Sequence, residues 1–437
     1  MGYGTVFAVR SSANDRGVPF VTIPKAADVS AGIWPRSGSA RGSATQKLTA
    51  SGLELSVISS RDGLASIATQ WLALWGKCPG ASGLFLSFPW VEVWCRRYLD
   101  PKSTVLAIVV GHHRGELSMV WPLAIERHMG IRTACMIGTP VSQYSDILID
   151  ASHADHQNWM HEGWDFIKHK LAVDILHLCK VRDDSALAVW LKTLKSEASN
   201  PESAPYISLH GAKNFEAVDE RFLNKDRKNR RRQRKRLGEL GTVGFRRSSA
   251  SSEATTAFDQ AMAWKREWIA AGGHVSAAFA SRQFDQFFTS LLGDGAALAG
   301  VETFELTLDG KPVAIKIAIT CGNYRGMHLT AYDRAFEKCG PGALLVEDMI
   351  RAGIADGINT LDFLAPAFDY KLDWASGSVG VADHALPVTG KGKAYHAIYI
   401  RMLRPRLKKL AADGPLPVRR LIAAVAKRAG RQVPQVC

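Results

Sequence analysis

The chain has 437 residues, of which 46% are hydrophobic and 22% charged, and its formal net charge is +14. At roughly 100 to 200 residues per domain, this length predicts two domains with additional terminal segments. No apolar run approaches the ~18 residues of a membrane-spanning helix, and the first residues lack the apolar segment of a secretory signal, so we expect a cytoplasmic protein.

The basic residues are concentrated in two stretches. Residues 225–236 carry a net charge of +8 and residues 401–437 carry +9, which leaves the remainder of the chain at −3. This distribution favours local anionic partners over a general coating of nucleic acid. The seven cysteines are scattered and lack the spacing of a metal site, so we expect reduced thiols and predict no bound metal.

The first half of the chain predicts an α/β module over residues 53–203, preceded by a disordered leader over 1–52 that is rich in Ser, Ala and Gly. Helical spacing predicts a helix over 64–75 and another that begins at Ser87 as its N-cap, with Pro89 in the first turn. The remaining elements expected here are strands at 104–110, 117–126, 132–138, 146–150 and 173–178 and helices at about 156–170 and 184–195.

The second half predicts a similar module over residues 204–395. Its expected elements are helices at about 214–240, 253–271 and 281–292, strands at 303–310, 311–320 and 323–333, a helix to about 356 and a strand at 359–365. The order of strand, glycine turn and longer strand recurs about 195 residues apart, at Gly115 and Gly310. A duplicated α/β module is the interpretation, and a chance match of two meanders is the alternative.

A glycine loop joins the strand at 323–333 to the helix that follows. Gly340, Pro341 and Gly342 stand where the helix begins, and amides at a helix start bind phosphate oxygens. Proline fits the first helical turn because its missing N–H has no partner there, and Lys338 adds a positive charge. A plain strand-to-helix turn is the alternative.

Alternation along the preceding strand predicts which side chains share a face. Met327, Leu329 and Ala331 are expected on one side. The polar face would then carry His328, Thr330 and Tyr332.

Five segments together resemble a known family: FLSFPWVEVWCRRYL, GTPVSQYSDILID, RKNRRRQRKRLGELGTV, AYDRAFEKCGPGALL and LDFLAPAFDYKLDWA. In this order they are similar to the acyltransferases named after the cellulose-biosynthesis protein CelD, in the GNAT superfamily. The resemblance covers residues 53–376. It implies two tandem GNAT-like modules, each a mixed, mainly antiparallel sheet flanked by helices, as in the peptidoglycan-bridge FemAB enzymes.

The resemblance also implies an acyl-coenzyme A donor. Its pyrophosphate would lie on the loop from Lys338 to Ala343, and its pantetheine arm alongside Thr330 and Tyr332, where that strand parts from the strand at 359–365. The usual GNAT loop begins with Gln or Arg and has two spaced glycines, whereas only Gly-Pro-Gly is present here. Cys339 would lie close to the phosphate as a packing residue.

Transfer from a thioester to an amine needs a neutral amine, donors for the oxyanion and a proton for the departing thiolate, but no nucleophilic side chain. Tyr332 is the candidate for protonating the thiolate, and His328 for accepting the amine proton. Asp362 interrupts an apolar strand, where an unpaired carboxylate is costly, and is a candidate for orienting or deprotonating the acceptor. The alternatives are a core or interface role for Tyr332, a core role for His328 and a structural hydrogen-bond network for Asp362.

Four further residues are candidates for binding the acceptor. Tyr370 and Lys371 match the YK pair of the family, and a structural hydrogen-bond network is their alternative role. Tyr144 and Asp146 of the first module are expected to line the same cleft. Lys316, in the apolar stretch VAIKIAIT, is a charge for which the sequence assigns no role.

The basic stretch at 225–236 predicts a solvated surface helix, or one that binds acceptor phosphates, anionic lipid or RNA. It lacks the aromatic residues of a single-strand-binding surface. Residues 396–437 form a basic amphipathic tail whose apolar stripe is typical of helices on anionic membranes, with docking on the protein's own core as the alternative.

The combined prediction is an acyl-CoA-dependent N-acyltransferase at the cytoplasmic face of the membrane. Its acceptor is an amine of a cell-envelope precursor, either an amino sugar of an exopolysaccharide or a long-chain amine that gives an amide lipid such as a ceramide. The alternatives are a FemAB-like transferase that uses aminoacyl-tRNA and a non-catalytic scaffold that binds RNA or membrane.

Overall fold

The computed structural model describes residues 47–100, 103–128, 130–271, 278–293, 300–403 and 406. Residues 1–46 of the predicted leader and 407–437 of the predicted tail lie outside these ranges. Lys47–Leu48 form a short strand that pairs with the strand Leu53–Ile58, so regular structure begins before the predicted position.

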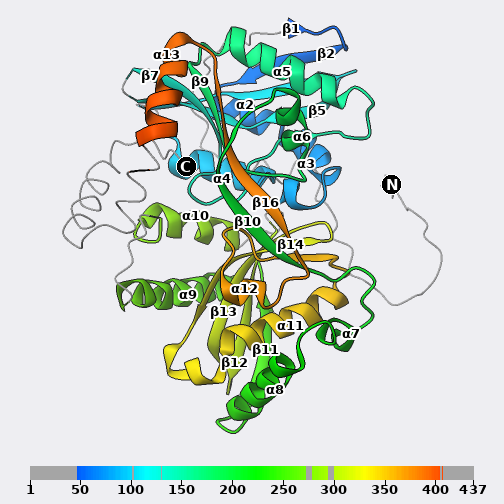
Figure 1. The fold of residues 1–437 in the computed structure, drawn as a ribbon, viewed down its shortest axis with the longest axis vertical. Helices are drawn as coiled ribbons and strands as arrows, with labels where there is room; N and C mark the ends of the chain where they lie inside the picture. The colour runs from blue at the N-terminus through cyan, green and yellow to red at the C-terminus, as the bar shows by residue number, and fades with distance from the viewer. Residues whose placement is uncertain are drawn as a thin grey trace, which may run out of the picture. The chain divides into compact units, whose positions relative to one another are not determined.

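The first half of the chain contains the predicted helices and strands in the predicted order (Figure 1). Ser87 caps its helix as predicted, because its Oγ accepts a hydrogen bond from the Trp90 amide. The elements are β1 (Lys47–Leu48), β2 (Leu53–Ile58), α2 (Arg61–Ser66), α3 (Ala68–Gly76), η1 (Ala81–Gly83), α4 (Phe88–Tyr98), β3 (Thr104–Leu106), β4 (Ile108–His113), β5 (Glu116–Trp121), β6 (Leu123–His128), β7 (Ile131–Met136), β8 (Leu148–Ile149), α5 (His156–Lys170), β9 (Ile175–Arg182), α6 (Ala186–Thr193) and β10 (Ala198–Ser208).

Three predicted elements of this half are divided in the structure. The helix predicted at 64–75 is interrupted at Ile67 between α2 and α3. The strands predicted at 104–110 and 117–126 each break, at Ala107 and Pro122, where the chain passes between two sheets. Pro122 has no N–H to donate to a ladder, which makes it suited to such a corner.

The second half contains α7 (Phe215–Asp219), α8 (Asn224–Gly238), β11 (Val243–Ser248), α9 (Ser252–Ala271), α10 (Arg282–Leu292), β12 (Val301–Leu308), β13 (Lys311–Cys321), β14 (Tyr324–Tyr332), η3 (Arg334–Cys339), α11 (Pro341–Ala355), β15 (Thr360–Asp362), α12 (Asp369–Leu372), β16 (Gly377–Pro387), α13 (Gly390–Tyr395) and η4 (His396–Leu403). The single helix predicted at 214–240 is two helices. The last element, η4, has π-helical geometry.

The strands form two sheets, and helices flank them. The five-stranded sheet has the order β1-β2-β4-β5-β8, and the eleven-stranded sheet has the order β11-β12-β13-β14-β15-β10-β16-β9-β7-β6-β3. All neighbours are antiparallel except two parallel pairs, β7 with β9 and β14 with β15. The predicted α/β class with mainly antiparallel sheets is confirmed.

Each parallel pair is short and is made in the same way. Thr133–Cys135 pair with Ile175–His177 in the first half, and Tyr324–Gly326 pair with Thr360–Asp362 in the second. In both halves the chain between the paired strands contains a long helix, α5 or α11. This repeated arrangement agrees with the duplication that the sequence predicts.

The large sheet is continuous because β10 and β16 cross between the halves. β10, which ends the first half, pairs with β15, and β16, which lies near the end of the second half, pairs with β9. The two strands also pair with each other, and Figure 1 shows them running side by side. The predicted module boundary between residues 203 and 204 therefore falls inside β10.

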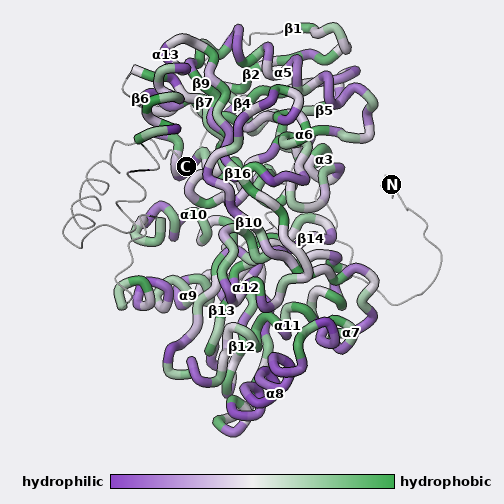
Figure 2. The backbone as a smooth tube through the Cα atoms, viewed as in Figure 1, coloured by the Kyte–Doolittle hydropathy of each residue, from purple (hydrophilic) through white to green (hydrophobic). Residues whose placement is uncertain are grey.

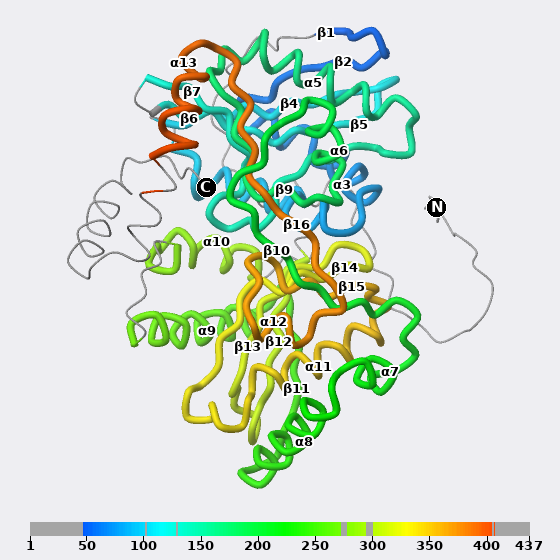
Figure 3. The backbone as a smooth tube through the Cα atoms, in the orientation of Figure 1, coloured from blue at the N-terminus to red at the C-terminus, as the bar shows by residue number. Residues whose placement is uncertain are grey.

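Helices cover both faces of the sheet in the second half (Figure 3). Residues of α9 and α10 share one hydrophobic cluster with Ile315, Ile317 and Leu329. Residues of α11 share another with Phe304 and Ala314. The two faces of β13 and β14 are thus buried by different helices.

The six described cysteines form no disulfide. Among the described helices, none combines the length and apolar character that crossing a membrane requires.

Candidate active site

The central feature of the site is the point where β14 and β15 separate. Their parallel pairing ends at Gly326 and Asp362. The chain then turns towards β10, since the Phe363 amide donates to the Pro205 carbonyl at 2.9 Å. β14 continues on β13 as far as Tyr332, so its other edge is unpaired by any described strand beyond Gly326. This is the separation at which the resemblance places the pantetheine arm.

A β-bulge lies directly beside this separation. Leu329 pairs with Ile317 and Met327 pairs with Ala318, which leaves His328 as the extra residue on β14. The prediction of strict alternation from 327 to 332 is therefore wrong at the bulge, because an extra residue shifts every side chain on one side of it. Met327 belongs to the cluster on the α11 face with Tyr332, opposite to Leu329.

The loop at the start of α11 leaves a backbone amide without a partner among the described residues. Gly340 has φ +58° and precedes the helix without any side-chain cap, and Pro341 occupies the first turn. The amides of Gly340 and Ala343 donate to backbone carbonyls within the loop. The Gly342 amide has no hydrogen-bond partner within the described residues.

The basic helix α8 lies against this loop. Arg236 donates to the Lys338 carbonyl at 2.9 Å, and a Cβ added at Gly340 would collide with the Gln233 amide. Arg234 donates to the Asp348 carboxylate of α11 at 2.7 Å. Figure 2 shows α8 as a strongly hydrophilic helix. Acidic partners thus hold its inner face, while its exposed cations are Lys225, Lys228, Arg231, Arg232, Lys235 and Arg236.

Asp362 is the centre of a buried hydrogen-bond network and is 0% exposed. Its carboxylate accepts hydrogen bonds from Tyr144 Oη at 2.9 Å, from Tyr324 Oη at 2.7 Å and from Arg182 Nη1 at 2.6 Å. The Leu364 amide donates to it as well. Burial raises the pKa of both tyrosines, which keeps their hydroxyl groups protonated and donating.

Sequence reasoning identified Asp362 and Tyr144 but missed Arg182 and Tyr324. Arg182 ends the strand β9 of the first half and also donates to Asp184 at 2.9 Å. No local pattern marks Arg182 as a partner of Asp362, since the two are 180 residues apart in the chain. The sequence did show a carboxylate, Asp362, within an apolar strand. That observation predicted that Asp362 has bonding partners but did not identify them.

His328 is enclosed by aromatic rings at the bulge. Its Nε2 donates to the Val141 carbonyl at 2.6 Å, and its ring lies near those of Phe85, Trp90 and Phe288. Burial lowers the pKa of this imidazole to about 4, so it is neutral near pH 7. Its Nδ1 is buried without a hydrogen-bond partner among the described residues.

Two lysines lie at the same end of β14. Lys371 Nζ donates to the carbonyls of Leu364 and Pro366 at 2.8 Å each, and burial lowers its pKa to about 8. Burial also lowers the pKa of Lys316 to about 7, with a smaller contribution from the charge of Lys371. Two amines therefore lie near the point where the strands separate.

The other predicted site residues lie apart from this centre. Tyr332 is at the loop end of β14, six residues or about 20 Å along the strand from the level of Asp362. Burial and the nearby Glu337 raise its pKa. Thr330 lies between the two ends as the register partner of Lys316. Cys339 is buried in the core beneath the loop, as its predicted packing role requires.

In each of the two predicted acceptor-binding pairs, only one residue lies at the centre of the site. Tyr144 reaches Asp362, whereas Asp146 accepts from the Ile147 amide, and burial raises the pKa of this carboxyl to about 6. Lys371 is buried, whereas Tyr370 is 51% exposed. The structure therefore brings Tyr144, Lys371, His328 and Asp362 to one end of β14 and leaves Asp146 and Tyr370 outside this network.

A surface hollow of about 520 Å³ lies elsewhere. Residues of α9, the β12–β13 turn and the start of η3 line it, among them Trp264, Asp309 and Phe336. It does not include the loop from Gly340 to Ala343.

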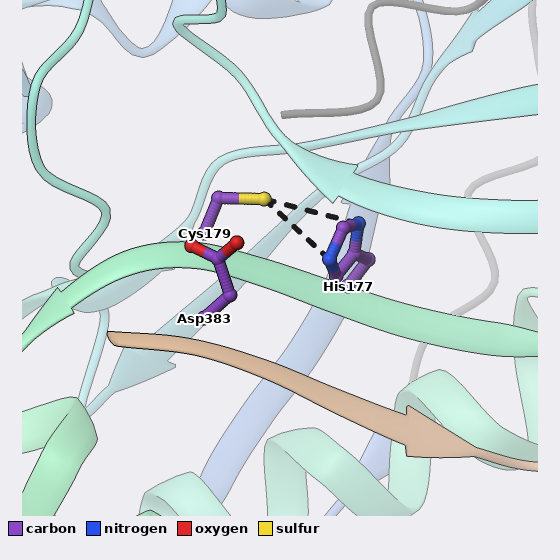
Figure 4. Close-up of side chains that lie close together, drawn as sticks. All are labelled: His177, Cys179 and Asp383. Atoms are coloured by element: carbon purple, nitrogen blue, oxygen red, sulfur yellow. Dashed lines mark hydrogen bonds between the residues drawn. The ribbon is translucent and has the colours of Figure 1, made fainter. Parts of the chain in front are cut away.

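Three side chains with metal-ligating atoms gather on β9 and β16 (Figure 4). Cys179 Sγ lies 3.6 Å from His177 Nε2, and the Asp383 carboxylate is close to both. The bulge between β9 and β16 has its extra residue on β9, opposite Asp383, whose oxygens accept from the Lys180 amide at 2.9 Å and from Asn200 at 2.6 Å. These hydrogen bonds give the buried carboxylate a structural role, because they support irregular strand backbone.

Comparison with known proteins adds the following findings. Residues 224–372 match the family described as acetyltransferase (GNAT) domain. No curated protein matches the chain. Among solved structures, that of FemX is similar with a TM-score of 0.54 at 12% identity, over 76% of this chain and 98% of the other. A tandem GNAT protein from the clavulanic acid biosynthesis pathway has a TM-score of 0.40 at 13% identity, over 77% and 99% of the two chains.

The chain thus contains a GNAT acetyltransferase domain, and it is an acyltransferase. The likeness to FemX extends over both halves and shows a shared fold. The family match confirms a GNAT domain over residues 224–372, in the second half of the chain. The narrower resemblance to the CelD family stays an interpretation of the five sequence segments.

Proposed function

We propose that the protein transfers an acyl group from acyl-CoA to an amine of a cell-envelope precursor. The observation that carries this proposal is the open edge of β14, which leads from the uncapped start of α11 to the point where β15 turns away. Its length suits a thioester carrier with phosphate at one end and the reacting sulfur at the other.

The phosphate end of the carrier lies at the loop in this proposal. The free Gly342 amide and the positive end of α11 attract phosphate oxygens, and Lys338 supplies a full charge. Tyr332 contacts the donor near this end. Thr330 lies along the pantetheine arm.

The reacting end lies beside His328 and Asp362. The described donors around Asp362 are already bonded to its carboxylate, so it positions Tyr144 and Tyr324 beside the end of β15 and does not act as the base. The neutral His328 ring has a free Nδ1 that accepts the amine proton. Its low pKa makes it a weak base that is available over the whole neutral range.

The acceptor carries negative charge in this proposal. The exposed face of α8 offers six cations beside the phosphate loop, which suits an amine borne on a phosphate-containing precursor. The amino sugar of an exopolysaccharide precursor and a long-chain amine both fit this description. Mass spectrometry of envelope extracts, with and without the gene, identifies the acylated product.

Binding of the donor provides the direct test. Acetyl-CoA and palmitoyl-CoA are titrated against the protein and a Gly342→Phe variant, and the shift of the melting temperature is measured. A Cβ at Gly342 meets only Tyr332 Cδ1 at 3.8 Å, so the new side chain fits the fold while its ring covers the free amide. We expect acyl-CoA to raise the melting temperature of the wild-type protein. The variant should bind acyl-CoA at least tenfold more weakly, which is about the effect of losing one charge-assisted hydrogen bond.

The matched control is Gly76→Phe, at the end of α3, where an added Cβ has open space. It should keep the wild-type shift. If neither thioester shifts the wild-type protein and an aminoacyl-tRNA does, the FemAB-like function replaces this proposal. The FemX-like fold makes that the second candidate.

A further inference from the structure

Lys316 is a buried basic residue that has no role in the acyl transfer proposed above. It lies in the middle of β13, is 1% exposed, and faces Phe304 on β12 and Thr330 on β14 in register. Among the described residues, its Nζ has one hydrogen-bond partner, the sulfur of Met327 at 3.6 Å. A thioether is a weak acceptor and an ammonium has three donors, so most of its hydrogen-bonding capacity is unused.

The amine of Lys316 is placed where β14 and β15 separate. Met327 directly follows Gly326, the last paired residue of β14, and Phe363 directly follows Asp362, the last paired residue of β15. Nζ contacts the first of these and lies 5.5 Å from the ring centroid of the second. The side chain therefore reaches from the neighbouring strand to the point of separation.

The surroundings of this amine are apolar apart from one cation. Phe304 faces it from β12, Met327 from β14 and Phe363 from the segment after β15. The charged group that acts on it is Lys371 of α12. Burying an ammonium group without an anionic partner costs folding free energy. Residues with such a cost are common at functional sites.

We propose that Nζ of Lys316 contacts the sulfur of the bound acyl-CoA and protonates the thiolate that leaves. This inference rests on the proposed function. With the pyrophosphate at Gly342, the extended arm follows β14 for about five residues, or about 17 Å, and ends at Met327. The sulfur then lies beside the Lys316 amine, whereas the neighbouring Lys371 amine donates to the carbonyls of Leu364 and Pro366.

The step balances without a further reactant. The acceptor nitrogen forms a bond to the thioester carbon, the carbon–sulfur bond breaks, and its electron pair stays on sulfur. Sulfur takes a proton from the Lys316 ammonium. The acceptor nitrogen releases its proton to His328, and this proton then returns to the neutral lysine. A group whose pKa is about 7 both gives and accepts a proton near neutral pH.

The test compares coenzyme A with desulfo-coenzyme A, which lacks the thiol. Both are titrated into the wild-type protein, Lys316→Met and Lys316→Arg, and the thiolate of bound coenzyme A is followed by its ultraviolet absorbance as the pH rises. In the wild-type protein we expect coenzyme A to bind about tenfold more tightly than desulfo-coenzyme A, with the pKa of its thiol lowered by about one unit. Lys316→Met should bind both compounds equally.

Lys316→Arg separates charge from proton transfer. Arginine keeps a cation but does not release a proton, so the bound thiol should still ionise early while the turnover number for acetyl-CoA falls and KM changes little. Equal thiol pKa values in wild type and Lys316→Met overturn the inference. Binding of desulfo-coenzyme A by every variant shows that the fold and the donor site are intact, whereas its failure to bind the wild-type protein overturns the proposed function itself.

Discussion

Replacing Lys316 by methionine should make the protein more stable, because the change removes a buried amine that has little to bind. Burial lowers the pKa of Lys316 from 10.5 to about 7. At about 1.4 kcal/mol per pKa unit, this difference corresponds to about 5 kcal/mol of lost stability. The side chain is 1% exposed, so solvent does not screen the effect. Methionine has a similar length and fits beside Met327 and Phe363.

The gain should depend on pH in a defined direction. Between pH 7 and 10.5 the unfolded chain holds a proton on Lys316 that the folded protein has released, so wild-type stability rises with pH in this window. The variant lacks this rise. Its advantage is therefore greatest at pH 7 and below, and it declines towards pH 10.

Urea unfolding of both proteins from pH 6 to 10 measures this difference. The control is Lys311→Met, an exposed position at the start of the same strand, where we expect a change within about 0.5 kcal/mol. A less stable Lys316→Met at pH 7, or parallel pH profiles for the two proteins, would refute the argument. Greater stability combined with slower turnover would be the signature of a residue retained for catalysis.

Two further predictions follow from the site and the tail. Asp362→Asn should lower the free energy of unfolding, measured in urea, by about 3 to 5 kcal/mol, because it leaves buried Arg182 without this carboxylate. Tyr324→Phe should lower it by about 1 to 2 kcal/mol. Equal losses in the two variants would contradict the central place of Asp362. Deleting residues 414–437 should release the protein from anionic vesicles, because each basic residue contributes about 1 kcal/mol near such a surface. Unchanged sedimentation with the vesicles would rule out the membrane-binding tail.

Local sequence patterns predicted the elements that depend on neighbouring residues. The cap at Ser87 and the helix α5 follow from side chains within one or two turns. The loop at Gly340 and Pro341 follows from backbone requirements that these two residue types meet. Each of these signals acts over a few residues, which is why the sequence shows it.

The network at Asp362 illustrates what a sequence shows only in part. A carboxylate in an apolar strand must have partners, and that much was predictable. Which partners it has depends on β9 and the loop at Tyr144 being brought next to β15 through β16 and β10. These contacts join residues 180 and 218 positions apart, and no local pattern records them.

The sequence by itself determined the α/β class, the order of most elements and the glycine loop, because each depends on short-range periodicity or backbone preference. Only the tertiary structure decided that β10 and β16 join the two halves in one sheet, that a bulge turns His328 towards the first half, and that the amine of Lys316 lies where β14 and β15 part. Strand pairing and register fixed all three, and their energy comes from contacts that exist only once the chain has folded.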